Sequence, residues 1–272
     1  MKKILFAIAT LLIAAGLVMV SCSKPAAPQD NNALVDDEPT DNPGGDDKPG
    51  EDTPGGEDTP PADNTPASLK GSNYYLIVME SVTGEAIASK VVADYRPNPD
   101  QGKNLWVWDA TYEGGETSGL SFYGTTEGWI CLKVTSVGWS GAGWNVNNKD
   151  GQAPDWAKMK DIAAEPDKYY LHLAYKGAKN EAHIIGFGYG TEYKFAIGEG
   201  VLGDAGVDYT AIAPINNDGK FDSKEWNEYE IKLSDMGIDF SADVTDANVL
   251  FVLSGGTTGK EVNLDAVFVY KK

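Results

Sequence analysis

Cysteine, histidine and arginine are scarce in this sequence. Its 272 residues include two cysteines, two histidines and a single arginine, Arg96. Neither His172 nor His183 has cysteines or carboxylates at the spacing of zinc ligands, so a zinc site is not expected. The nucleophile elbow, the phosphate-binding loop and the dinucleotide fingerprint are also missing, so no catalytic class is indicated. The net charge of the chain is −19, of which residues 71–272 carry −12. A domain this acidic repels phosphate backbones, so nucleic acid is not an expected partner.

The first 22 residues predict export and a lipid anchor. A Met-Lys-Lys start precedes the apolar run Ile4–Val20, as in a secretion signal. The following Ser21-Cys22 resembles the lipobox of bacterial lipoproteins. This resemblance implies that residues 1–21 are removed, and that Cys22 is lipidated and holds the protein in the outer membrane, facing the cell exterior. A transmembrane anchor is the alternative, because this mostly apolar run of 17 residues approaches the length that spans a bilayer.

Residues 22–70 predict a disordered tether. The segment 23–70 holds nine of the 14 prolines, has a charge of −9 and offers almost nothing apolar to bury. Such a coil holds the domain that follows it away from the membrane surface. With Cys22 committed to lipid, Cys131 has no partner for an intrachain disulfide and is expected to be a small buried residue.

Residues 71–272 predict one all-β domain, a jelly-roll β-sandwich. Short segments of alternating or β-branched character are separated by turn residues, and a helical pattern occurs only at 155–164. The expected strands cover residues 74–80, 85–93, 104–109, 120–123, 129–137, 169–175, 183–189, 193–197, 228–233, 248–253 and 261–270.

The stretch 128–156 contains four of the seven tryptophans and is the first candidate for a binding site. Its glycine-rich part, 138–144, predicts an irregular loop that carries Trp139 and Trp144. An aromatic ring covers the apolar face of a sugar, and the neighbouring Asn145 and Asn147 offer hydrogen bonds to its hydroxyls. The alternative is that these rings fill the core of the sandwich, where large aromatics dominate.

Trp106 and Trp108 form the second candidate. They alternate with Leu105 and Val107, so both tryptophans lie on one face of a strand and both aliphatic residues lie on the other. Two rings on one face favour a flat platform for a glycan chain or, equally, a pair of core residues.

Residues 214–225 partly match a calcium-binding loop. Asn216, Asp218, Asp222 and Glu225 fall at its third, fifth, ninth and twelfth positions. Pro214 occupies the first position, which normally supplies a carboxylate, and flanking helices are not predicted. A turn that enters a strand explains the same residues. We therefore expect no cofactor, with calcium at this loop as the alternative.

The closing segments, 226–233, 249–253 and 262–268, resemble the last strands of jelly-roll carbohydrate-binding modules. Residues 156–175, a helical turn followed by a tyrosine-rich strand, are similar to the surface glycan-binding lipoproteins of starch-utilisation-type systems in Bacteroidetes. The resemblance implies a non-catalytic lipoprotein that holds polysaccharide near a porin-like importer and its partner lipoprotein. The alternatives are a sandwich-fold glycoside hydrolase or lyase on the same tether, and a surface adhesin or pilus-type subunit.

Overall fold

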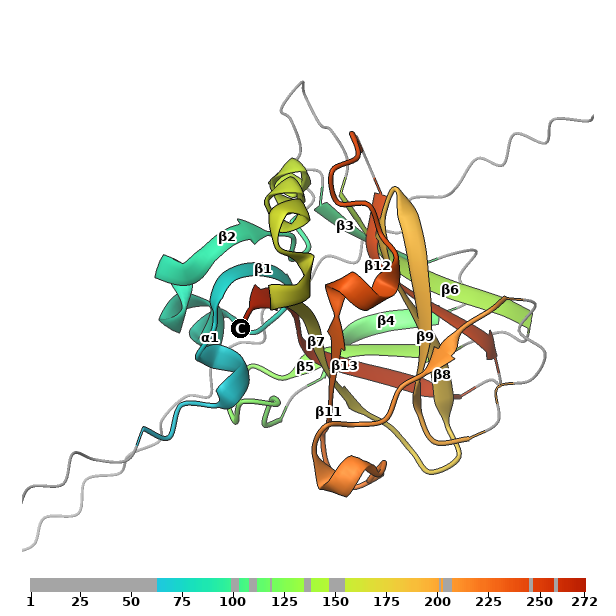
Figure 1. Cartoon of the computed structure of the whole chain (residues 1–272). Helices are drawn as coiled ribbons and strands as arrows, with labels where there is room; N and C mark the ends of the chain where they lie inside the picture. The colour runs from blue at the N-terminus through green and yellow to red at the C-terminus, as the bar shows by residue number, and fades with distance from the viewer. Residues whose placement is uncertain are drawn as a thin grey trace, which may run out of the picture. The chain divides into compact units, whose positions relative to one another are not determined.

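Strands are the main regular structure of the folded part of the chain, and they form two sheets (Figure 1). The computed structural model describes residues 63–272 except 99–102, 108–111, 118, 135–137, 147–154, 201, 203–206, 245–246 and 257–258. The predicted signal, Cys22 and almost all of the predicted tether lie outside the described residues. Among the described residues, no helix has the length and apolar content to cross a membrane.

Sheet 1 is built around its longest strand, β13 (Glu261–Lys271), which lies next to β7 (Tyr169–Lys176) on one side. On its other side, β13 pairs first with β5 (Trp129–Val134) and then with β1 (Ser72–Val78). The strands β11 (Asn227–Lys232), β2 (Val91–Asp94) and β4 (Tyr112–Thr117) pair with β7, β1 and β5, respectively. All these pairs are antiparallel except β1 with β2.

Sheet 2 has the order β10-β9-β8-β12-β6-β3. Its strands are β3 (Lys103–Val107), β6 (Gly138–Val146), β8 (Ala182–Tyr189), β9 (Thr191–Gly198), β10 (Thr210–Ala211) and β12 (Ala247–Gly256). The predicted pair at 183–189 and 193–197 is confirmed as the β8–β9 hairpin.

The helical elements are short. They are α1 (Ser81–Ala86) and the 3-10 helices η1 (Ala67–Leu69), η2 (Ala88–Lys90), η5 (Asp155–Ala164), η6 (Pro166–Lys168), η7 (Asn217–Gly219) and η8 (Leu233–Met236). The helical pattern predicted at 155–164 is confirmed as η5, which buries Met159 and Ile162 completely.

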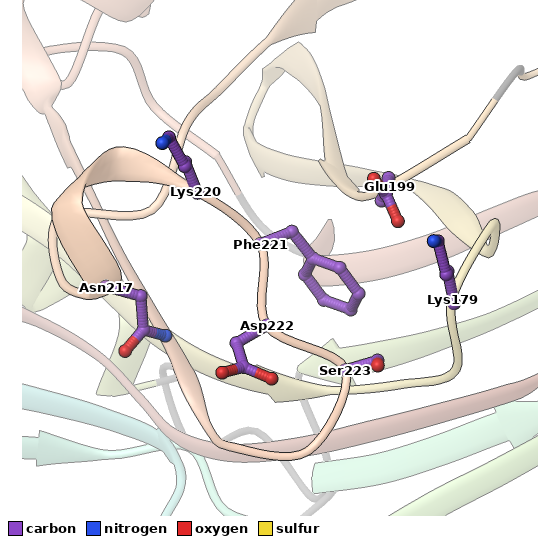
Figure 2. Close-up of a pocket in the computed structure, with 7 residues that line it drawn as sticks. All are labelled: Lys179, Glu199, Asn217, Lys220, Phe221, Asp222 and Ser223. Atoms are coloured by element: carbon purple, nitrogen blue, oxygen red, sulfur yellow. The ribbon is translucent and has the colours of Figure 1, made fainter.

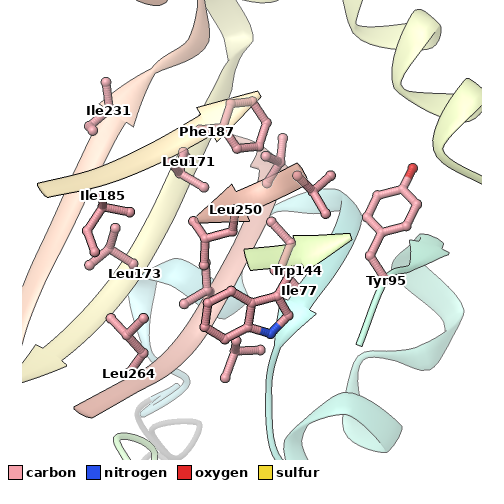
Figure 3. Close-up of a cluster of buried hydrophobic side chains, with 14 of the residues drawn as sticks. Ile77, Tyr95, Trp144, Leu171, Leu173, Ile185, Phe187, Ile231, Leu250 and Leu264 are labelled. Carbon is pink, nitrogen blue, oxygen red and sulfur yellow. The ribbon is translucent and has the colours of Figure 1, made fainter. Parts of the chain in front are cut away.

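The core lies between the two sheets (Figure 3). Alternation in β7 sends Leu171 and Leu173 into it, and Ile185 and Phe187 enter it from β8. Each such side chain contributes roughly 1.5–3 kcal/mol when it is fully buried. Two layers of mostly antiparallel strands around one core confirm the predicted all-β sandwich.

Several predicted segments were wrong in detail. Residues 85–93 form the end of α1, then η2, and become a strand only at 91–93, the first three residues of β2. Residues 120–123 contain no strand, and β4, with two glycines, was not predicted. The segment 138–144 is part of β6, not a loop. This strand lies between β12 and β3, and its backbone pairs with both of them. Pairing on both sides outweighs the low strand preference of its glycines.

Candidate binding groove

Trp144, one of the predicted platform residues, lies in the core. Its side chain is 1% exposed and packs among the aliphatic residues between the sheets (Figure 3). Its indole Nε1 has no hydrogen-bond partner in the described part of the chain. A ring enclosed in this way cannot stack on a sugar. The platform prediction was wrong for Trp144, and the alternative of a core residue is correct.

The other predicted platform residues belong to sheet 2 or lie outside the described residues. In the backbone register, Trp106 of β3 lies opposite Gly143 of β6, and Trp139 of β6 lies opposite Gly255 of β12. Asn145 is also in β6. The structure thus places three of the predicted residues on two neighbouring strands. The side chains of these three, and the whole of Trp108 and Asn147, lie outside the described part, so this platform stays a prediction.

The predicted calcium loop is tied into the turn that leads to β11. The Asn216 side chain donates from Nδ2 to the Trp226 carbonyl oxygen and accepts at Oδ1 from the Glu228 N–H, each at 2.9 Å. Asp222 Oδ1 accepts from the Lys224 N–H at 2.9 Å. Asp218 has a positive φ of 54°, and Glu225 is exposed. These bonds account for the polar residues as parts of a turn. Among the described residues, no three His, Cys, Asp or Glu side chains are grouped to hold a metal.

A solvent-facing hollow of about 550 Å³ lies on the outer face of sheet 1, the face turned away from sheet 2. We call it the Trp129 hollow. It is lined by Trp129, Cys131, Lys176, Gly177, Ala178, Glu181, Ser223, Gly259, Glu261 and Asn263. Its size is in the range of small-ligand sites.

Strand register creates the floor of this hollow. Cys131 of β5, Asn263 of β13 and Lys176 of β7 lie directly opposite one another in a row across three strands. Their chain neighbours Leu132 and Val262 point the other way, into the core. Because side chains alternate along a strand, burying the aliphatic residues forces the polar row outward.

The half-buried Trp129 ring is held in a defined orientation. Its Nε1 donates to Asn263 Oδ1 at 2.8 Å, and Asn263 Nδ2 donates to the Lys176 carbonyl oxygen at 3.0 Å. The Trp226 ring lies perpendicular to it at 5.5 Å between centroids. The ammonium group of Lys176 is 5.9 Å from the centroid of the Trp129 ring, a cation–π distance.

A second hollow of about 400 Å³, which we call the Phe221 hollow, adjoins the first (Figure 2). Ser223 lines both of them. Figure 2 shows the Phe221 ring beside Lys179, Glu199, Asp222 and Ser223. The ring stacks on Tyr175, with centroids 5.9 Å apart and an interplanar angle of 28°.

Two buried acids, Asp265 and Glu80, lie next to the residues that pack against Trp226. Phe122 packs edge-on against Trp226 at 6.3 Å, and its N–H donates to Asp265 Oδ2 at 2.7 Å. Burial, together with the neighbouring Glu80, raises the pKa of Asp265 to about 7. Glu80 Oε1 accepts from the hydroxyls of Thr83 and Ser121. A proton on Asp265 relieves the repulsion between the two acids.

Neither hollow was predicted from the sequence. The alternation Trp129-Ile130-Cys131-Leu132-Lys133 shows that Trp129 and Cys131 share a face, but the strand alone does not tell which face meets solvent. Trp226, Asn263 and Phe221 are 92 to 134 positions farther along the chain. Only the strand order brings them together.

Comparison with known proteins gives fold-level similarities. No protein-family model matches the sequence, and no curated protein matches it. Among solved structures, a family 30 carbohydrate-binding module of a Clostridium thermocellum cellulosomal cellulase is 18% identical, with 63% of this chain and 92% of that chain covered and a TM-score of 0.36. SGBP-B from a xyloglucan utilization locus of Bacteroides uniformis is 14% identical, with 62% and 48% covered and a TM-score of 0.34.

A third similar structure is TmCBM61 in complex with β-1,4-galactotriose. It is 9% identical, with 65% of this chain and 95% of that chain covered and a TM-score of 0.33. Similarity at these levels does not assign a ligand to this chain.

Proposed function

We propose that this protein is a cell-surface lipoprotein that binds a polysaccharide or oligosaccharide without cleaving it. The observation that carries the proposal is the Trp129 hollow. It presents a fixed indole ring beside an amide, a hydroxyl, carboxylates and an ammonium group. The ring offers a surface for the apolar face of a pyranose, and the polar groups offer both donors and acceptors to its hydroxyls.

The tether and anchor complete the proposal. Cys22 carries the lipid, the part of the tether that precedes residue 63 acts as a flexible spacer, and the sandwich holds glycan near a porin-like importer and its partner lipoprotein. Many copies on one surface raise the overall avidity of a weak single site.

The binding site is tested by calorimetric titration of the mature chain, with Cys22→Ser, against a panel of soluble polysaccharides. Trp129→Ala is expected to weaken binding by about tenfold or more, as the loss of one central aromatic contact does. Tyr170→Ala is the matched control, because this half-buried ring lies on the same face six positions from Lys176 along β7. Trp139→Ala tests the platform predicted in sheet 2.

Three outcomes separate the alternatives. Binding that survives Trp129→Ala but is lost with Trp139→Ala moves the site to sheet 2. Oligosaccharide release during the titration indicates a hydrolase or lyase, for which Glu181 and Glu261 in the same hollow are the carboxyl groups to replace. A folded protein that binds no glycan of a broad panel contradicts the proposal and favours the adhesin alternative.

The anchor is tested separately. With Cys22→Ala, we expect the protein to lose labelled fatty acid and to leave the membrane fraction. Retention in that fraction without label would instead support the transmembrane alternative.

A further inference from the structure

We propose that the Trp129 hollow and the Phe221 hollow form one continuous groove that takes an internal stretch of a linear, neutral glycan, with Phe221 as its second stacking ring. The inference rests on the proposed function and specifies the ligand of that site.

Two segments of the chain contribute residues to both hollows. The segment 177–181 contributes Gly177, Ala178 and Glu181 to the first hollow and Lys179 to the second. The segment 220–223 contributes Ser223 to both hollows and the Phe221 ring to the second. With the walls shared and one serine common to both, the two hollows are parts of one surface depression.

Each half of the groove has one aromatic ring that is supported from behind. Trp226 and the Asn263 side chain support Trp129. Phe221 stacks on Tyr175, which is fully buried. Rings held in this way lose little conformational freedom on binding, which favours them as stacking surfaces.

Close packing at Gly177 keeps the Tyr175 ring in place against Phe221. A Cβ at this position would lie 1.9 Å from the Tyr175 hydroxyl oxygen and 2.4 Å from its ring carbon Cζ. Any side chain here would displace Tyr175, and with it the ring on which Phe221 rests. The glycine therefore lets the 177–181 segment approach the Tyr175 ring, on which Phe221 stacks.

The size and charge of the groove define the class of ligand. Two adjoining spaces of about 550 and 400 Å³ exceed what a single sugar unit fills. The described lining residues include three lysines and four acids, which gives the groove a net charge of only −1. They are Lys176, Lys179, Lys220, Glu181, Glu199, Asp222 and Glu261. Without an excess of positive charge, the groove has no preference for an acidic polysaccharide, whereas its donors and acceptors suit neutral hydroxyls.

The experiment uses a length series of the oligosaccharide that the polysaccharide panel identifies. Affinity for the intact protein is expected to rise with chain length and to be unchanged when the reducing end is converted to an alditol. Phe221→Ala should lower the affinity for the longest oligosaccharides by about tenfold and leave that for the shortest ones unchanged. Tyr209→Ala, which removes an exposed ring that lines neither hollow, is the control.

Thiol labelling locates the ligand independently of affinity. With Cys22→Ser, the thiol of Cys131 is the only one in the chain, and it lines the first hollow. In a Cys131→Ser background, Lys179→Cys places a thiol at the second hollow. Short oligosaccharides should slow maleimide labelling at Cys131 alone, whereas long ones should slow it at both positions.

The outcomes distinguish this inference from the proposed function. If glycan binds and protects Cys131, but Phe221→Ala has no effect at any length and the thiol from Lys179→Cys is never protected, the single-site function stands and the extended groove is wrong. Binding abolished by alditol conversion also overturns it, because the groove would then hold a chain end. If no glycan binds, both proposals fail.

Discussion

The core between the sheets and the outer face of sheet 1 each contain a tryptophan and a histidine, but these residues are held in different ways. In the core, Trp144 is enclosed by aliphatic side chains, and its Nε1 has no partner within the described residues. On the outer face, Trp129 donates to Asn263, and His172 donates from Nδ1 to the Ala266 carbonyl oxygen at 2.7 Å. Among the described residues, packing holds the core ring, whereas a hydrogen bond fixes the orientation of the outer one.

Because of this difference, we expect the core ring to stabilise the fold and the outer ring to bind a ligand. A ring held by packing contributes through the apolar area it buries, and its loss leaves a cavity. A half-exposed ring with a fixed orientation contributes less to folding and is available to a ligand. The comparison predicts opposite effects for the two tryptophans, and the following changes test it.

The largest effect is expected for Trp144→Ala. Removing the ring from the core should lower the free energy of unfolding by about 3–5 kcal/mol. Urea denaturation of the mature chain with Cys22→Ser measures this, and Trp144→Phe, which keeps most of the apolar volume, should cost clearly less. A loss below about 1 kcal/mol for Trp144→Ala would show that the ring is not a structural part of the core.

His183, the histidine in the core, should make the free energy of unfolding decrease as the pH falls. Burial, with a smaller contribution from Lys260, lowers the pKa of His183 to about 3. The folded protein therefore keeps this side chain neutral, while the unfolded chain takes up a proton below pH 6.5. Its contribution to stability is complete above pH 6.5 and is lost as the pH falls toward 3, at up to about 1.4 kcal/mol per pH unit.

His183→Phe isolates this effect. The variant keeps an aromatic ring beside Tyr175, whose centroid is 5.6 Å from that of His183, but it cannot take up a proton. The slope of unfolding free energy against pH between 6.5 and 4.5 should become shallower than that of the parent protein. Parallel slopes would contradict a neutral, buried His183.

Asp265 and Glu80, the acid pair on the outer face, should make the free energy of unfolding decrease as the pH rises. Because the pKa of Asp265 is raised to about 7 by burial and by Glu80, the folded state holds a proton that the unfolded chain releases above pH 4. Stability from this group is greatest below pH 4 and declines as the pH rises to about 7. Glu80→Gln replaces the repelling charge with an amide that keeps an oxygen for Thr83 and Ser121.

We expect Glu80→Gln to raise the free energy of unfolding at pH 8 by on the order of 1 kcal/mol, with little change at pH 4. The measurement is thermal or urea unfolding at both values, with a chelator present so that a bound cation does not neutralise the pair. Destabilisation by the variant at pH 8 would show that the two acids do not repel each other in the folded protein.

The same comparison explains what the sequence could predict. Alternation and turn residues predicted the sandwich, the β8–β9 hairpin and the strands β7, β11 and β13, because burial of one face imposes a period of two. The face on which a ring lies is set by pairing between distant strands. Trp144 therefore could not be told from a surface ring, and Trp129 could not be linked to Asn263, 134 positions later.

The glycine-rich segment 138–144 shows a second limit. In isolation, its three glycines favour a loop, and the predicted platform depended on that interpretation. In the fold, β12 and β3 pair with this segment on both sides. Pairing of this kind depends on long-range contacts that no local pattern contains.

The smallest effect on stability is expected for Trp129→Phe, and it tests the comparison most sharply. Phenylalanine keeps an aromatic face next to Trp226 and Lys176 but removes the Nε1 donor to Asn263. A half-exposed hydrogen bond of this kind contributes about 1 kcal/mol at most. The free energy of glycan binding should nevertheless fall by more than the free energy of unfolding does, because the ring loses its fixed orientation. Equal losses, measured by urea unfolding and calorimetric titration of the same variant, would mean that Trp129, like Trp144, serves the fold alone.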